Sequence, residues 1–200
     1  SLVGSEMCIR DSYNWIQDNI KKVDKATNGK VGYIYIPDMG PEGLNEFSRY
    51  FYPQLDKEGL IIDDRANGGG NVSPMILERL SREPYRLTMR RGSSLIGTVP
   101  DAVQVGPKVC LINKYSASDG DLFPWGFRAL SLGKLIGTRT WGGIIGISGP
   151  LPYMDGTDIR VPFFTSYDPK TGNWIIENHG VDPDILIDND PIKEWNGEDQ

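Results

Sequence analysis

The sequence has little cysteine and little histidine. Its 200 residues include two cysteines, Cys8 and Cys110, which lie far apart and form no C-x-x-C pair, and one histidine, His179. These counts exclude a disulfide framework and a zinc site rich in cysteine or histidine, and we expect neither a metal nor a cofactor. A hydrolase that activates a serine with imidazole would have to use His179 or a histidine from outside the chain.

Positive charge and long apolar runs are also scarce. The 21 lysines and arginines are outnumbered by 27 aspartates and glutamates, which gives a net charge of −6 at pH 7. This balance offers no general attraction to nucleic-acid phosphates or anionic lipids. No apolar run approaches the roughly 18 residues that a membrane-spanning helix needs. We therefore expect neither nucleic-acid nor membrane partners.

The remaining composition, with 38% hydrophobic and 24% charged residues, is typical of one globular domain. Apolar periodicity predicts helices over 13–25, 43–55, 73–82 and 119–132, and strands over 31–36, 59–64, 84–89 and 108–113. Strands that alternate with helices indicate an α/β fold with parallel pairing. After Gly137 the Gly and Pro turns separate short alternating segments, which predicts a β-rich second half.

The two ends of the sequence differ from the rest. Residues 1–12 show neither apolar periodicity nor the pattern of a signal peptide, and they resemble the translation of a sequencing-adapter tail. We therefore expect residues 1–12 to be non-native, residues 13–190 to form the core domain, and residues 191–200 to be a truncated C-terminal segment.

A glycine-rich loop follows the second predicted strand. The segment 63–73 reads DDRANGGGNVS and leads into a predicted helix. Consecutive glycines let backbone N–H groups converge on an anion at a helix N-terminus. The segment matches neither the dinucleotide fingerprint nor the P-loop, so a nucleotide site is disfavoured. The loop is either an anion site, for a phosphate or an oxyanion, or a flexible turn.

A second strand-to-helix loop, NKYSASDGDLFPW over 113–125, contains a candidate nucleophile. Ser118 would stand at the positive end of the following helix, where the N–H of Asp119 can point at the same oxyanion. Ser116 and Ser118 could instead both be helix caps, since Ser followed by Asp is a common capping pattern. Because neighbouring parallel strands end at one edge of a sheet, the glycines would lie beside Ser118, which favours acyl transfer.

The segment 173–185 holds the other titratable candidates. His179 could be a general base, but Gly180 and the pair Asp182-Pro183 predict a turn in which the histidine is exposed. Glu177 could orient a base, but its local sequence alone favours the alternative, a solvated carboxylate.

Six segments follow one another along the chain: VGYIYIPDMG, NEFSRYFYPQLD, LIIDDRANGGG, KYSASDGDLFPW, LIGTRTWGGIIGI and ENHGVDPDI. In this order they resemble the catalytic C-terminal domain of tricorn-type proteases, over residues 13–190. That family is a branch of the serine peptidases that includes the C-terminal-processing peptidases. The resemblance implies the αβ-spiral core shared with Clp protease and crotonase, here with the β-rich second half.

The resemblance also implies roles for particular residues. Ser118 is then the nucleophile, the N–H groups of Asp119 and of Gly69 or Gly70 form the oxyanion hole, and Glu177 is the acidic member of the charge relay. In the family a serine–histidine pair comes from a segment upstream of a PDZ domain, and neither is in this sequence. We therefore expect a serine peptidase domain that hydrolyses oligopeptides through an acyl-enzyme but is inactive alone.

One departure separates two branches of the family. The C-terminal-processing peptidases use a lysine base in a T-F-G-K-G-like motif, and here the matching stretch 140–144 reads TWGGI, with Gly143 at the lysine position. This favours the tricorn-like branch, which implies peptide substrates, a hexamer and a cytoplasmic location. A catalytically silent peptide-binding module and an acyl-CoA enzyme of the crotonase type remain as alternatives.

Overall fold

A five-stranded parallel sheet forms the centre of the protein in the computed structural model, which describes residues 2–147 and 151–199. Its strand order is β1-β2-β5-β6-β11, and each neighbouring pair is parallel. The strands are β1 Val31–Tyr35, β2 Gly59–Asp63, β5 Lys108–Ile112, β6 Gly133–Gly137 and β11 Ile185–Leu186. Because all five run the same way, the loops after their carboxyl ends meet at one edge.

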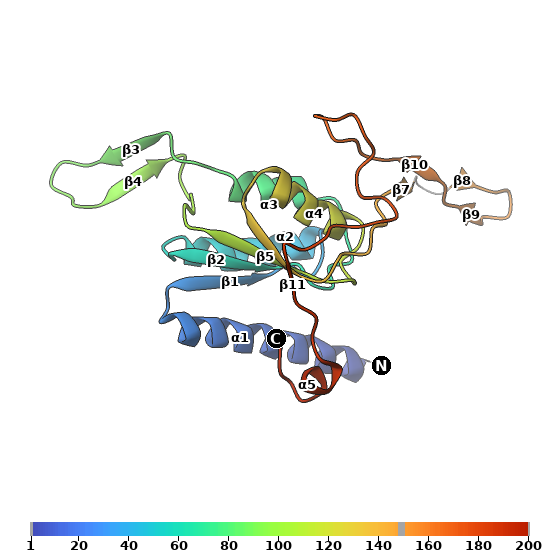
Figure 1. The fold of residues 1–200 in the computed structure, drawn as a ribbon, viewed down its shortest axis with the longest axis horizontal. Helices are drawn as coiled ribbons and strands as arrows, with labels where there is room; N and C mark the ends of the chain where they lie inside the picture. Colours follow the sequence, from blue (N-terminus) through green and yellow to red (C-terminus); the bar gives the residue numbers. More distant parts are fainter. Residues whose placement is uncertain (1, 148–150, 200) are drawn as a thin grey trace.

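Three helices cover one face of this sheet (Figure 1). They are α2 Pro41–Phe51, which continues into the 3-10 turn η1 Tyr52–Gln54, α3 Ser73–Leu80 and α4 Asp119–Ala129. Phe51, Phe123 and Phe127 from these helices share one buried cluster with Ile34 and Ile62 from the strands. Burial of a side chain of this size contributes about 1.5–3 kcal/mol, so this layer fixes the strands and the loops that follow them.

The long helix α1 Leu2–Thr27 lies on the other side of the sheet (Figure 1). Its Asn19 Nδ2 donates to the Tyr33 hydroxyl at 3.2 Å, and that hydroxyl donates to Asp63 Oδ2 at 2.7 Å. Burial, followed by the negative charge of Asp63, raises the pKa of Tyr33. The helix also includes residues 2–12, which have no apolar periodicity and were left out of the expected core domain. Extending a helix that has already formed costs little. The division into tail, core and C-terminal segment stays a prediction.

The other strands form three small antiparallel pairs. They are β3 Arg86–Met89 with β4 Ile96–Val99, β7 Gly146–Ile147 with β10 Pro162–Phe164, and β8 Leu151–Pro152 with β9 Asp158–Ile159. In Figure 1 the β3–β4 hairpin projects from the left end, and the other two pairs lie at the right. The strand expected over 84–89 is thus part of a hairpin, because its short connection to β4 cannot make a parallel crossover.

The mixed α/β architecture with a β-rich second half agrees with the sequence analysis, although α2 and α4 end earlier than expected, at Phe51 and Ala129. A short helix, α5 Pro191–Trp195, follows the last strand. Within residues 2–147 and 151–199, no helix has both the length and the apolar character to cross a membrane.

Candidate active site

The glycine loop and the loop that carries Ser118 lie against each other at the carboxyl ends of β2 and β5. A Cβ atom placed on Gly69 would be 2.6 Å from Ser118 Cβ and 3.1 Å from the Asp119 nitrogen. The Ala117 N–H donates to the Asn67 carbonyl at 2.9 Å, which joins the two loops. Only a residue without a side chain fits at Gly69, so the glycine permits this close approach.

The backbone at Ser118 has an unusual conformation for a residue with a side chain. Its φ is 59° and its ψ is −119°, and α4 begins at the next residue. The side chain is exposed and makes no capping hydrogen bond to the helix. Ser116 is also no cap, because its Oγ donates to the buried Asp64 carbonyl at 2.8 Å. The capping interpretation therefore fails for both serines, and strain of this kind is typical of functional positions.

Two backbone N–H groups near Ser118 have no acceptor among the described residues, those of Asp119 and Gly70. The Gly69 N–H, in contrast, donates to Asn67 Oδ1 at 2.9 Å. Gly70 packs closely against the backbone of Met39. A Cβ on Gly70 would lie 2.0 Å from the Met39 carbonyl oxygen, so this position requires glycine. Of the two glycines named in the sequence analysis, Gly70 has the N–H without an acceptor in the described part of the chain, and Gly69 provides the space.

Asn67 holds the glycine loop in place and was not identified from the sequence. It is fully buried, and its Nδ2 donates to the Ile36 carbonyl at 3.0 Å while its Oδ1 accepts the Gly69 N–H. One side chain thereby ties the loop to the end of β1. An amide inside a glycine-rich segment is the only signal for this role that the sequence carries.

Buried carboxylates surround the start of α4. Asp119 accepts hydrogen bonds from the Ser73 N–H at 3.0 Å and from the Ser73 hydroxyl, which joins α4 to α3. Asp121 accepts from the Gly142 N–H at 2.7 Å. Neither contact was expected from the sequence, and both place negative charge at the positive end of α4, where it is favourable.

Asp64, the residue after β2, is a fully buried carboxyl group. Neither of its side-chain oxygens has a hydrogen bond among the described residues. Burial raises the pKa of Asp64 well above its ordinary value, and the charges of Asp63, Asp121 and Asp119 raise it further. The neutral acid is therefore favoured at this position.

Glu177 and His179 lie in a turn near the segment that follows β6. Glu177 is half-buried, and its Oε2 accepts from the N–H groups of Ile144 at 2.7 Å and Ile145 at 2.9 Å, so it is more than a solvated carboxylate. His179 is exposed as expected, and its Nε2 lies 2.7 Å from Asp182 Oδ2. No contact joins either residue to the side chain of Ser118 within the described chain.

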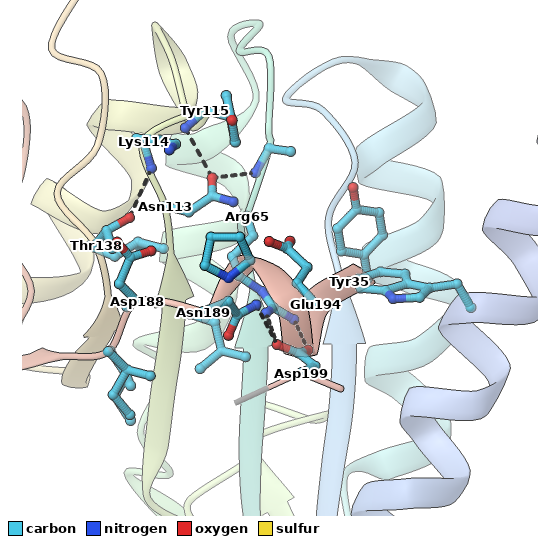
Figure 2. Close-up of a pocket in the computed structure, with 18 residues that line it drawn as sticks. Tyr35, Arg65, Asn113, Lys114, Tyr115, Thr138, Asp188, Asn189, Glu194 and Asp199 are labelled. Atoms are coloured by element: carbon cyan, nitrogen blue, oxygen red, sulfur yellow. Dashed lines mark hydrogen bonds and ion pairs between the residues drawn. The ribbon is translucent and has the colours of Figure 1, made fainter. Parts of the chain in front are cut away.

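A cavity of about 680 Å³ lies at the same edge of the sheet but is not lined by Ser118. Figure 2 shows Asn113 on the wall of this cavity. The Asn113 Oδ1 accepts hydrogen bonds from the N–H groups of Ala66 at 2.9 Å and Tyr115 at 3.1 Å. Arg65 pairs there with Asp199 at 2.7 Å. The cavity and the serine therefore involve different residues of the same two loops. Across the part of the chain that the structure describes, no group of three His, Cys, Asp or Glu residues could hold a metal ion.

In this parallel α/β domain the glycine loop follows β2 and the exposed serine follows the neighbouring strand β5. Acyl-transfer sites are built from such a pair of loops. The chain belongs to peptidase family S41, whose family model matches residues 30–187. It is similar to the tricorn protease of Thermoplasma volcanium, with 44% identity over 177 residues, which are 88% of this chain and 17% of that protein. Tricorn protease homolog 1 of Streptomyces coelicolor is 36% identical over 185 residues, or 92% of this chain and 17% of the homolog.

Solved structures agree with this assignment. The crystal structure of the tricorn protease matches with a TM-score of 0.85 and 41% identity, covering 92% of this chain and 18% of that chain. A putative peptidase from Parabacteroides merdae, at 22% identity and a TM-score of 0.60, covers 86% of this chain and 59% of its own and shares the fold. The resemblance predicted from the sequence is confirmed. The chain spans 17% of the length of each of these two tricorn relatives.

Proposed function

We propose that this domain supplies the nucleophile and the oxyanion hole of a serine peptidase that hydrolyses oligopeptides through an acyl-enzyme. The observation that carries the proposal is the Ser118 backbone, held at positive φ against the glycine loop, where the N–H groups of Asp119 and Gly70 have no acceptor among the described residues. Membership of family S41 supports a peptidase, and the tricorn relatives support peptide substrates.

In the proposed reaction Ser118 Oγ attacks the scissile carbonyl carbon as a general base removes its proton. The negative charge that develops on the carbonyl oxygen is held by the N–H groups of Asp119 and Gly70. The base then protonates the leaving amine, and water releases the acyl group by the reverse steps. Removing one oxyanion donor typically costs about 10²–10³ in rate, so backbone donors on a fixed loop contribute strongly.

The general base is proposed to come from outside this sequence. His179 is paired with Asp182, and family resemblance points to a serine–histidine pair from an upstream segment, with Glu177 as the acidic member of the relay. A longer, hexameric, cytoplasmic protein of the tricorn type is part of the same proposal. The 200 residues alone then lack peptidase activity.

The test compares hydrolysis of a pooled fluorogenic peptide library by the longer protein, by its Ser118→Ala variant and by residues 1–200 alone. Ser94→Ala is the matched control, since Ser94 is exposed in the turn between β3 and β4. We expect the longer protein and the control to cleave, and Ser118→Ala to lose at least about 10³ of the rate.

Three results would contradict parts of this proposal. Cleavage by Ser118→Ala at the wild-type rate would remove Ser118 as the nucleophile. Robust turnover by residues 1–200 would remove the external base. A longer protein that binds peptides without cleaving them would instead be a silent peptide-binding module of the same fold.

A further inference from the structure

Asp121, in the first turn of α4, makes contacts that the proposed reaction does not use. It is fully buried three residues after Ser118. Its Oδ1 accepts the Gly142 N–H at 2.7 Å and its Oδ2 accepts the Gly143 N–H at 3.3 Å. The Asp121 N–H also donates to the Ser118 carbonyl at 2.9 Å. Asp121 therefore joins the backbone of the serine, through its own N–H, to the segment after β6, through its carboxylate.

The same segment continues directly to Glu177. The N–H groups of Ile144 and Ile145 donate to Glu177 Oε2 at 2.7 and 2.9 Å. Four successive N–H groups, those of residues 142–145, thus end on two carboxylates. Asp121 and Glu177 are in this way connected through a single short stretch of backbone.

This stretch has little room to move independently. Gly142 has a φ of +88°, and a Cβ on it would be 2.4 Å from the Gly180 nitrogen. The Trp141 N–H donates to the Ser116 carbonyl at 2.9 Å, and the Gly142 carbonyl accepts from the Asn178 N–H at 2.7 Å. The segment is therefore enclosed between the serine loop and the turn that carries Glu177.

Burial is the largest influence on Asp121 and raises its pKa, while the hydrogen bonds from Thr140, Gly142, Ser118 and Gly143 act in the opposite direction. Hydrogen bonds to an ionised carboxylate are about twice as strong as neutral ones and fix the donors more firmly. Loss of this carboxylate would leave the N–H groups of Gly142 and Gly143 without their acceptor.

We propose that Asp121 is a positioning residue that holds Ser118 and Glu177 in one fixed arrangement through residues 142–145. The inference rests on the proposed function, because it gives Ser118 and Glu177 their roles. Asp121 itself contacts neither substrate nor the reacting atoms. Its removal lets the serine shift relative to the relay, and a misplacement near 1 Å costs about 10² in rate.

The test measures kcat and KM for Asp121→Ala and Asp121→Asn in the longer protein. The control is Asp155→Asn, since Asp155 accepts the Thr157 N–H in an exposed turn of the β8–β9 pair. We expect Asp121→Ala to lower kcat about 100-fold with KM changed less than about threefold. Asp121→Asn keeps an oxygen acceptor for Gly142 and should recover about tenfold of that loss.

The outcomes separate this inference from the function on which it rests. A wild-type kcat in Asp121→Ala, in a protein that Ser118→Ala inactivates, overturns the inference alone. A peptidase activity that does not depend on Ser118 overturns the proposed function. A raised KM with unchanged kcat shows a substrate contact, and unfolding of both variants, seen by far-UV circular dichroism, shows a folding determinant; both overturn the positioning role.

Discussion

The central sheet and the projecting hairpins differ in how they treat apolar side chains. Ile34 and Phe123 in the sheet and its helix layer are 0% exposed, whereas Leu87 in β3 and Phe163 in β10 are 62% and 76% exposed. The glycine loop and Ser118 both follow strands of the buried sheet, β2 and β5. Sites on rigid elements keep their geometry more precisely than sites on weakly packed segments.

This difference indicates a division of roles. The sheet and its helices provide the stability that holds the two loops together, and the hairpins add little to the folding of the chain that carries them. Substitutions of the same type should therefore have very different effects in the two regions. Two Phe→Ala substitutions and one substitution of a buried carboxyl group test this, in order of decreasing effect.

Phe123→Ala should cause the largest loss. Phe123 is buried in the helix layer, in the core cluster that also contains Phe127. Truncation leaves a cavity, and the free energy of unfolding should fall by about 3–5 kcal/mol, measured by urea denaturation. A loss below about 1 kcal/mol would mean that the sheet layer does not dominate stability.

Asp64→Asn should change stability in a pH-dependent way. The folded protein raises the pKa of Asp64, so the unfolded chain ionises this group at lower pH than the folded protein does. Wild-type stability therefore falls as pH rises from the ordinary value toward the raised one, and asparagine removes this loss. We expect the variant to be more stable than wild type near pH 7 and similar to wild type below about pH 4.

The measurement is urea unfolding of wild type and Asp64→Asn across this pH range, with Asp56→Asn as a control. Asp56 is an exposed carboxylate in the turn before β2. A difference between wild type and Asp64→Asn that does not change with pH would show that Asp64 is ionised in the folded protein.

Phe163→Ala should have the smallest effect. Its ring is mostly exposed, so truncation should change the free energy of unfolding by less than about 0.5 kcal/mol in the same urea assay. A loss close to that of Phe123→Ala would show that the hairpin packs against something in solution, and the contrast between the two regions would then fail.

Much of the fold could be predicted because its strands carry their own signal. The strands β1, β2 and β5 come from short apolar runs that local sequence is enough to identify. The β3–β4 hairpin was only half predicted, because β4 Ile96–Val99 contains Gly97 and has no fully buried residue. Local pattern says little about a strand that is not buried.

The site was predicted in part, for a physical reason. The meeting of Gly69 with Ser118 follows from parallel strand order alone. Asn67 and Asp121 were missed because their partners, Ile36 and Gly142, lie 31 and 21 residues away in the sequence. Such partners become visible only when the tertiary contacts are known. The roles of Ser118, Asp119, Gly69, Gly70 and Glu177 stay predictions.

The positive φ of Ser118 also has a consequence for protein engineering. Glycine would adopt this conformation at lower cost, so Ser118→Gly would relax the backbone and delete the hydroxyl in one step. A screen that rewards heat resistance alone would favour that change. Directed evolution of this domain therefore needs a second criterion, without which its gains in robustness could come from the residue proposed to do the chemistry.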